Sequence, residues 1–146
     1  MDYKVCEILI VEDNPNDAEL MLRTLRKNHV ANEIVVVEDG EEALDFLFRM
    51  GENDEKTGYL PPKVIFLDLN LPKVDGLEVL RCLKSDSKTK KIPVVIISSS
   101  KENPDIETAY DIGANSYVVK PVDIEEFVGT LSQIGMYWLA VNQKPQ

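Results

Sequence analysis

The stretch that decides the fold is Val64-Ile65-Phe66-Leu67-Asp68-Leu69-Asn70-Leu71-Pro72. Its first four residues are apolar and too few for a helix, and the residues after Asp68 are typical of a turn. The pattern therefore predicts a buried strand with a carboxylate at its exit. Ligands of open α/β folds bind beyond the carboxyl ends of the strands, which makes Asp68 the first candidate for a functional residue.

A second apolar run also ends in acids, because Ile8–Val11 is followed directly by Glu12 and Asp13. If the two strands are neighbours, three carboxylates converge. Such a cluster repels itself unless a cation binds among the acids or some of them stay protonated. Carboxylate oxygens are hard ligands that suit Mg²⁺, so Glu12, Asp13 and Asp68 form a candidate magnesium site.

Strand and helix patterns alternate five times along the chain. The expected strands are Cys6–Val11, Ile34–Val37, Lys63–Leu67, Val94–Ile97 and Ser116–Val119. Each strand is followed by a segment with apolar residues at helical spacing. The first helix has Ala18, Met21, Leu22 and Leu25, and the second, at about Glu41–Met50, has Ala43, Phe46, Leu47 and Met50. The third has Gly76, Val79, Leu80 and Leu83, the fourth has Ile106, Ala109 and Tyr110, and the fifth, from about Asp123, has Ile124, Phe127, Val128 and Leu131.

The first, third and fourth strands are continuously apolar, as are parallel strands that are covered on both faces. This alternation predicts an α/β fold with a doubly wound, five-stranded parallel sheet and five helices. Right-handed crossovers then place the carboxyl ends of all strands at one edge. The acids after the first and third strands should meet there with Ser98.

Local signals mark the helix starts. Asn14 can cap the first helix, Pro15 suits its first turn, and Asp17 would complete an acidic version of the capping box. Asp75 is read as the cap of the helix that begins at Gly76 rather than as a ligand.

Composition bounds the class of protein. The 146 residues suffice for one domain with a core at about residues 6–141, with no output domain expected after it. The net charge of −10 argues against nonspecific binding to nucleic acid. No apolar run approaches the ~18 residues of a membrane helix and no secretory signal is visible, so a cytoplasmic protein is expected. Cys6 and Cys82 are expected to be reduced thiols that serve as small hydrophobic side chains rather than to form a disulfide.

Two polar residues at strand ends add to the candidate site. Ser98 offers a hydroxyl, and Lys120 offers an ammonium that can pair with a carboxylate or a phosphoryl group. A carboxylate nucleophile, a divalent cation and an ammonium are the groups needed to transfer a phosphoryl group to an aspartate.

From roughly Cys6 to Leu131 the chain resembles the receiver domains of two-component response regulators. The resemblance rests on four motifs, which occur in order with βα units between them: Glu12-Asp13-Asn14, Asp68 with Leu71-Pro72-Lys73-Val74-Asp75-Gly76, Ile96-Ile97-Ser98-Ser99, and Gly113-Ala114-Asn115-Ser116-Tyr117-Val118-Val119-Lys120-Pro121. It implies the flavodoxin-like receiver fold with strand order 2-1-3-4-5.

The resemblance implies a role for each matching position around the acid. Asp68 would be the phosphoacceptor. Glu12 and Asp13 would hold Mg²⁺ together with Asp68 and the backbone carbonyl of Asn70. Glu12 stands where Asp is commoner in the family, and its longer side chain allows ligation through water.

The resemblance also implies roles for the last two strands. Lys120 would pair first with the acceptor and then with the phosphoryl group, and Pro121 would follow it through a cis peptide bond. Ser98 and Tyr117 would form the switch pair, the hydroxyl moving toward the phosphoryl group and the ring turning inward behind it. Other roles stay open: Ser98 as the cap of a turn, Tyr117 as a fixed strand aromatic and Lys120 as a structural counter-charge.

The implied partner is a sensor histidine kinase. The Asp68–Lys73 segment, the polar segment Gly51–Pro62 and the Tyr137-Trp138-Leu139 ending are similar to single-domain regulators that partner phytochrome-type kinases. The 51–62 segment reads as a surface loop or a partner contact. The last helix is more apolar than a sheet requires, because Met136, Tyr137, Trp138, Leu139 and Val141 cannot all face the core. This predicts a homodimer through the region of the last helix, with Phe127 and Trp138; alternatively, Trp138 folds back on its own domain.

Other functions remain to be weighed. A phosphorelay intermediate would pass the phosphate onward, and a pseudo-receiver would bind partners without phosphorylation. An aspartyl-phosphate phosphatase would need an acid at position 70, where Asn70 cannot act as one, and a flavodoxin-like cofactor binder would need a phosphate loop after the first strand. The module is expected to catalyse only its own phosphorylation and dephosphorylation, so it is not a turnover enzyme.

Overall fold

The sheet at the centre of the molecule has the predicted order, β2-β1-β3-β4-β5, with all strands parallel. The computed structural model describes residues 6–27, 33–52 and 61–143. In chain order the elements there are β1 (Ile8–Val11), α1 (Pro15–Lys27), β2 (Ile34–Val37), α2 (Gly40–Glu52), β3 (Val64–Leu67), α4 (Gly76–Ser85), β4 (Val94–Ser98), α5 (Asn103–Ile112), β5 (Ser116–Val119), α6 (Ile124–Met136) and η1 (Tyr137–Val141), a π-helical segment.

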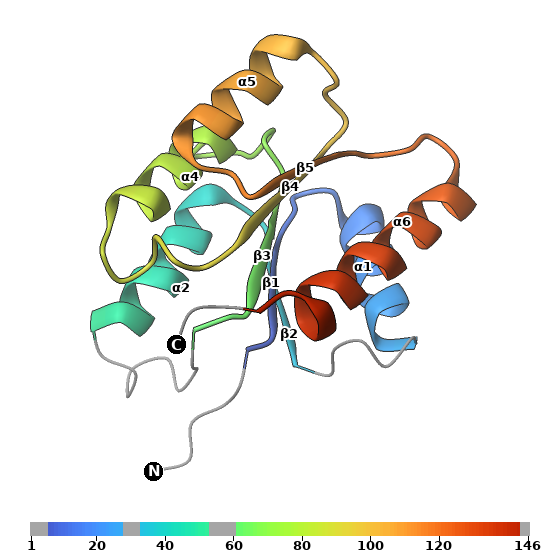
Figure 1. The fold of residues 1–146 in the computed structure, drawn as a ribbon, viewed down its shortest axis with the longest axis horizontal. Helices are drawn as coiled ribbons and strands as arrows, with labels where there is room; N and C mark the ends of the chain where they lie inside the picture. The colour runs from blue at the N-terminus through green and yellow to red at the C-terminus, as the bar shows by residue number, and fades with distance from the viewer. Residues whose placement is uncertain (1–5, 28–32, 53–60, 144–146) are drawn as a thin grey trace.

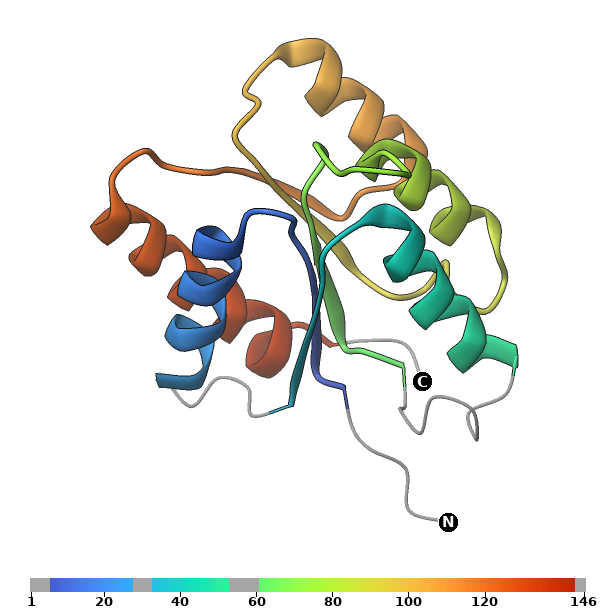
Figure 2. The ribbon, with the colours of Figure 1, turned by 180° about the vertical axis from the view of Figure 1, so that it is seen from behind.

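The helices cover both faces of the sheet. Helices α1 and α6 lie side by side on one face, and α2, α4 and α5 lie on the other, as the two opposite views show (Figure 1, Figure 2). Strands β1, β3 and β4 are buried along their whole length. Their unbroken apolar runs therefore reflect burial on both faces, as predicted.

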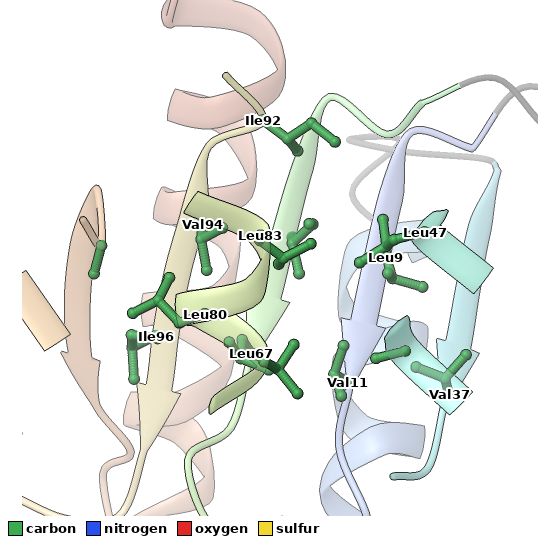
Figure 3. Packing of buried hydrophobic residues seen from close by; sticks show 14 of the residues in the cluster. Leu9, Val11, Val37, Leu47, Leu67, Leu80, Leu83, Ile92, Val94 and Ile96 are labelled. Carbon is green, nitrogen blue, oxygen red and sulfur yellow. The ribbon is translucent and has the colours of Figure 1, made fainter. Parts of the chain in front are cut away.

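Two apolar clusters form the core, one on each face of the sheet. On the α2–α4–α5 side, Leu80 and Leu83 of α4 pack over β3 and β4, and Leu47 of α2 packs near β1 (Figure 3). On the α1–α6 side, Met21, Leu25, Phe127 and Leu131 cover the other face. Burying a large apolar side chain contributes ~1.5–3 kcal/mol, so these two layers dominate the free energy that holds the sheet.

Element boundaries differ from the predictions by one to three residues. Strand β1 begins at Ile8 rather than Cys6, although Cys6 is buried and its thiol is free, as expected. Helix α2 extends to Glu52, so the predicted loop at 51–62 begins later than expected. Residues 53–60 of that loop lie outside the described residues.

The predicted apolar faces need three corrections. Ile124 and Tyr110 are 67% and 49% exposed rather than buried. The first turn of α6 protrudes away from the sheet (Figure 1), which leaves Ile124 without core to pack on. Phe127 is only 4% exposed and belongs to the core, so the prediction that it contacts a second subunit was wrong. Trp138 packs against the same cluster, which is the alternative that the sequence left open.

Within the three described segments, no helix combines the length and the apolar character that a membrane span requires.

Candidate functional site

The candidate site lies at the carboxyl edge of the sheet, where backbone hydrogen bonds continue past the strand ends. The Asp68 N–H donates to the Val11 carbonyl (3.1 Å), and the Lys120 N–H donates to the Ser98 carbonyl (2.8 Å). These bonds extend the β1–β3 and β4–β5 ladders by one residue. The position of each functional side chain is therefore set by the sheet register rather than by a free loop.

The three predicted cation ligands converge. Glu12, Asp13 and Asp68 each offer an oxygen, and these oxygens all lie within 4.8 Å of one another. Glu12 and Asp68 are 2% and 6% exposed, whereas Asp13 is exposed. Two buried carboxylates and one open to solvent fit a hard divalent cation that keeps water in its remaining positions.

The Lys120 ammonium lies among carboxylates. Its Nζ donates to Glu12 Oε1 at 2.5 Å, to Asp17 Oδ2 at 3.1 Å and to Asp68 Oδ2 at 3.2 Å. Lys120 therefore lies beside Asp68, as predicted. Each N–H of the ammonium has its own carboxylate, which satisfies all of its donors.

Asp17 is the member of this cluster that the sequence did not reveal. The Asn14 side chain caps α1 as predicted, accepting from the N–H groups of Asn16 and Asp17. The predicted capping box is wrong, because the Asn14 N–H donates to Glu12 Oε2 (3.2 Å) and not to Asp17. The Asp17 carboxylate points to Lys120 instead, 103 residues away in the chain.

Burial and charge shift the protonation of this cluster. Burial raises the pKa of Glu12 to about 7; the Lys120 hydrogen bond opposes the rise, and the nearby Asp68 charge adds to it. Burial by itself lowers the pKa of Lys120. Its hydrogen bonds and charge interactions with Glu12, Asp68 and Asp17 outweigh that effect and raise the pKa of Lys120 above its usual value. The ammonium is therefore charged at neutral pH.

A cavity of about 490 Å³ opens onto these groups. Its lining includes Glu12, Asp13, Asp68, Asn70 and Lys120, together with Ser99. Ser98, the predicted hydroxyl, is fully buried, and its Oγ accepts from the Ser100 N–H (3.2 Å). The turn-capping role left open for Ser98 is therefore seen in this structure.

Ser100 connects the two predicted switch residues. Its N–H bonds to Ser98 Oγ, and its carbonyl accepts from the Tyr117 hydroxyl (2.7 Å). Its own hydroxyl donates to Asp105 Oδ2 (2.5 Å) in the first turn of α5. Tyr117 is half-buried against the core on the α4–α5 side. Ser100 thus connects Ser98 at the carboxyl edge of the sheet, Tyr117 of β5 and the N-terminus of α5.

The remaining predictions concern the turns around Asp68 and Lys120. Asp75 caps α4 as expected, accepting from the Leu77 N–H at 2.8 Å. The Asn70 N–H donates to Asp68 Oδ1 at 3.3 Å; ligation by its carbonyl stays a prediction. The cis bond expected before Pro121 is not found, because every peptide bond among the described residues is trans. Either isomer costs little at an Xaa-Pro bond.

Comparison with known proteins places the chain in a family. The model of the response regulator receiver domain matches residues 8–132, so the chain belongs to the response regulator receiver family. It is 39% identical over 138 residues to the probable methanogenesis regulatory protein FilR2 of Methanothrix harundinacea, covering 94% of this chain and 86% of that protein. It is 34% identical over 132 residues to the response regulator Rcp1 of Synechocystis sp., covering 90% and 88%.

Solved structures agree with this placement. The phosphorylated cyanobacterial phytochrome response regulator RcpA matches with a TM-score of 0.87 and 38% identity, covering 99% of each chain. The Mn²⁺-bound form of Rcp1 matches with a TM-score of 0.86, covering 98% of this chain and 99% of that one. A divalent cation is thus known in a similar receiver, and in this chain three carboxylates converge at the corresponding edge of the sheet.

Proposed function

We propose that this receiver accepts a phosphoryl group on Asp68 from a histidine kinase and signals through protein contacts. One observation supports this above all: the buried Asp68 carboxylate belongs to the cation trio and also lies 3.2 Å from the Lys120 ammonium. Positive charge would thus approach the acceptor from two sides, which is the arrangement that phosphoryl transfer needs.

In the proposed reaction an oxygen of Asp68 attacks the phosphorus of the kinase phosphohistidine. A new O–P bond forms, the N–P bond breaks, and its electron pair stays with the imidazole nitrogen. A divalent cation held by Glu12, Asp13 and Asp68 would neutralise charge on the phosphoryl oxygens. Lys120, already charged, would exchange its contact with the Asp68 oxygen for one with a phosphoryl oxygen.

The response would pass through Ser100. A phosphoryl group on Asp68 adds about −1.5 to −2 charges and several strong acceptors, which would draw the Ser98 hydroxyl toward the site. Ser98 would then give up its bond from the Ser100 N–H, and the loop that moves also carries the carbonyl bonded to Tyr117. Reversing a two-state switch takes about 5.5 kcal/mol, which two or three charge-assisted hydrogen bonds of ~1.5–3 kcal/mol supply.

We further propose a phytochrome-type kinase as the partner. The similarity to Rcp1 and to the phytochrome response regulator RcpA over nearly the whole chain supports this. Because such kinases draw on ATP, the exchange is expected in the cytoplasm. Transfer from a phytochrome-type kinase should be at least tenfold faster than from an unrelated histidine kinase under the same conditions, and equal rates would count against this partner.

A homodimer also remains our proposal, through the end of the last helix as first predicted but without Phe127. Met136, Tyr137 and Val141 are 49%, 47% and 64% exposed at the end of α6 and in η1. Tyr137 stacks edge-on against Trp138 at 5.1 Å, which gives it a fixed orientation. Sedimentation should show a dimer that Tyr137→Glu dissociates. A monomer at tens of micromolar, with and without phosphorylation, would remove the proposal.

The phosphoacceptor role is tested by a phosphate-affinity gel after incubation with acetyl phosphate and Mg²⁺. The wild-type protein should shift, and Asp68→Asn should not. Both should run unshifted without Mg²⁺. A shift of Asp68→Asn at the wild-type level would disprove the assignment.

A further inference from the structure

The Lys120 ammonium is bonded to an acid that belongs to neither the cation trio nor the acceptor. Glu12 and Asp68 both have a second task, since their oxygens form the cation site with Asp13. Asp17 lies outside that trio, yet its Oδ2 is 3.1 Å from Lys120 Nζ, about as close as Asp68. Of the three carboxylates bonded to Lys120, Asp17 is thus the one that would bind neither the cation nor the phosphoryl group.

We propose that Asp17 is the positioning residue for Lys120: it holds the ammonium over the acceptor while Glu12 and Asp68 bind the cation and Asp68 is phosphorylated. This rests on the proposed phosphoacceptor function of Asp68. Asp17 itself touches neither reacting atom, and it acts through Lys120.

The local structure leaves the Asp17 carboxylate free for this task. In a capping box that carboxylate would accept from the Asn14 N–H, but Glu12 takes that donor. The Asn14 side chain in turn serves the first N–H groups of α1. The helix start is therefore satisfied without the Asp17 side chain. Asp17 is also only 32% exposed at its side chain, against 59% for Glu19 further along α1.

The Lys120 ammonium must be held in place because a second cavity next to the site could accommodate its side chain. Beside the acceptor cavity lies a second one of about 390 Å³ between α1 and the start of α6. Asp17, Ser99 and Lys120 line both cavities and form the wall between them. The second cavity is otherwise largely apolar, with Leu20 and Pro121 among its lining residues. A long lysine side chain released from Asp17 can swing into that space, whereas a bond to Asp17 keeps it at the boundary, facing Asp68.

The test compares initial rates of acyl phosphate formation from acetyl phosphate, measured at saturating phosphodonor and over a range of Mg²⁺ concentrations. Asp17→Ala should lower the maximal rate roughly tenfold, the worth of one charge-assisted hydrogen bond. The Mg²⁺ concentration for half-maximal rate should stay within about twofold, because Asp17 is not in the cation trio. Asp17→Glu keeps a carboxylate and should recover part of the rate.

Two controls separate positioning from a general loss of charge or fold. Glu19→Gln removes one charge from the same helix, where Glu19 pairs with the exposed Arg23 at 3.0 Å, and its rate should match the wild type. In a Lys120→Met background, followed over a longer time course, adding Asp17→Ala should cause no further loss. If Asp17→Ala unfolds, Asp17→Asn, which preserves the shape of the side chain, takes its place in both arms.

Three results would overturn the inference. The first is a wild-type rate in both Asp17→Ala and Asp17→Asn, and the second is an equal loss of rate when Asp17→Ala is added to Lys120→Met. The third is a rise in the Mg²⁺ concentration for half-maximal rate that accompanies the loss of rate, which would make Asp17 a cation ligand. Failure of the proposed function looks different, because the wild-type protein itself would then form no acyl phosphate on Asp68.

Discussion

A Cβ atom added at Gly76 would lie 2.2 Å from the carbonyl oxygen of Asp68. The Gly76 N–H also donates to the Leu69 carbonyl at 2.9 Å. The N-terminus of α4 therefore rests directly on the backbone of the proposed acceptor, and no other residue type fits between them. The glycine in the Asp75-Gly76 pair, which from sequence marks only a helix start, also fixes the turn that carries Asp68.

Gly76→Ala should disturb both stability and the site. The contact is with backbone atoms that cannot move aside cheaply, so we expect a loss of ~1–3 kcal/mol in the free energy of unfolding and slower phosphorylation of Asp68. Urea unfolding and acetyl phosphate labelling measure the two effects. Gly129→Ala is the matched control, because nothing lies within 4 Å of its added Cβ; in a helix it should stabilise by ~0.5–1 kcal/mol. Equal unfolding free energies and equal labelling rates in the two variants would show that Gly76 does not pack closely against the Asp68 carbonyl.

Cation affinity should depend on Asp13 and not on Asp75. Asp13 is the exposed member of the carboxylate trio, and Asp13→Asn removes one charge from it, so Mg²⁺ binding measured by calorimetry should weaken at least tenfold. Asp75→Asn is the control, because asparagine still caps α4 and should leave Mg²⁺ affinity unchanged. If Asp75→Asn weakened Mg²⁺ as much as Asp13→Asn, the ligand assignment would need revision.

The opposite edge of the sheet depends on Lys84. Its Nζ donates to the carbonyls of Lys90 (3.1 Å) and Ile92 (3.0 Å) and to Asn115 Oδ1 (3.0 Å). Lys84→Met should lower the free energy of unfolding by about 2 kcal/mol without changing the rate of Asp68 phosphorylation per folded molecule. Lys91→Met, at an exposed position in the same connection, should be close to neutral. A drop of less than 0.5 kcal/mol for Lys84→Met, roughly the surface-mutation range, would contradict this account.

Stability should fall at alkaline pH because of Cys6. Burial raises the pKa of the Cys6 thiol to about 12 from 9.0. The neutral thiol favours the folded state fully below the unfolded-state pKa, and this contribution is lost as pH rises from about 9 toward 12. The slope is about 1.4 kcal/mol per pH unit. Urea unfolding of Cys6→Ala should show a shallower decline across this range than the wild type, since other titrating groups cancel in the comparison. If the unfolding free energies of Cys6→Ala and the wild type declined in parallel with pH, Cys6 would ionise freely in the folded protein.

Much of this architecture follows from short runs of residues. Buried parallel strands carry unbroken apolar segments, and the acids that end them must meet at one edge, so Asp68, Glu12 and Asp13 could be placed together in advance. Lys120 was within reach for the same reason, because it follows β5 directly. These inferences need only the order of the strands in the sheet and the fact that all of these residues directly follow the carboxyl ends of strands.

Contacts between distant parts of the chain were not predictable in this way. The position of Asp17 fits a local capping pattern, but the Asn14 N–H donates to the longer side chain of Glu12 instead. The Asp17 carboxylate accepts from Lys120, 103 positions away. The sequence left two placements open for Trp138 because helix phase changes after Met136, where η1 adopts π-helical bonding, as in the Asn142 N–H to Tyr137 carbonyl bond. An apolar stripe counted at 3.6 residues per turn no longer identifies the buried face there.

The central claim is that Asp68 is the residue that carries the phosphoryl group. Its most direct test is reduction of the acetyl phosphate-treated protein with borohydride, which converts an aspartyl phosphate to homoserine, followed by peptide mass spectrometry. We expect homoserine at position 68, dependent on Mg²⁺. An unmodified residue 68, or homoserine at Asp13 or Asp75 instead, would contradict it.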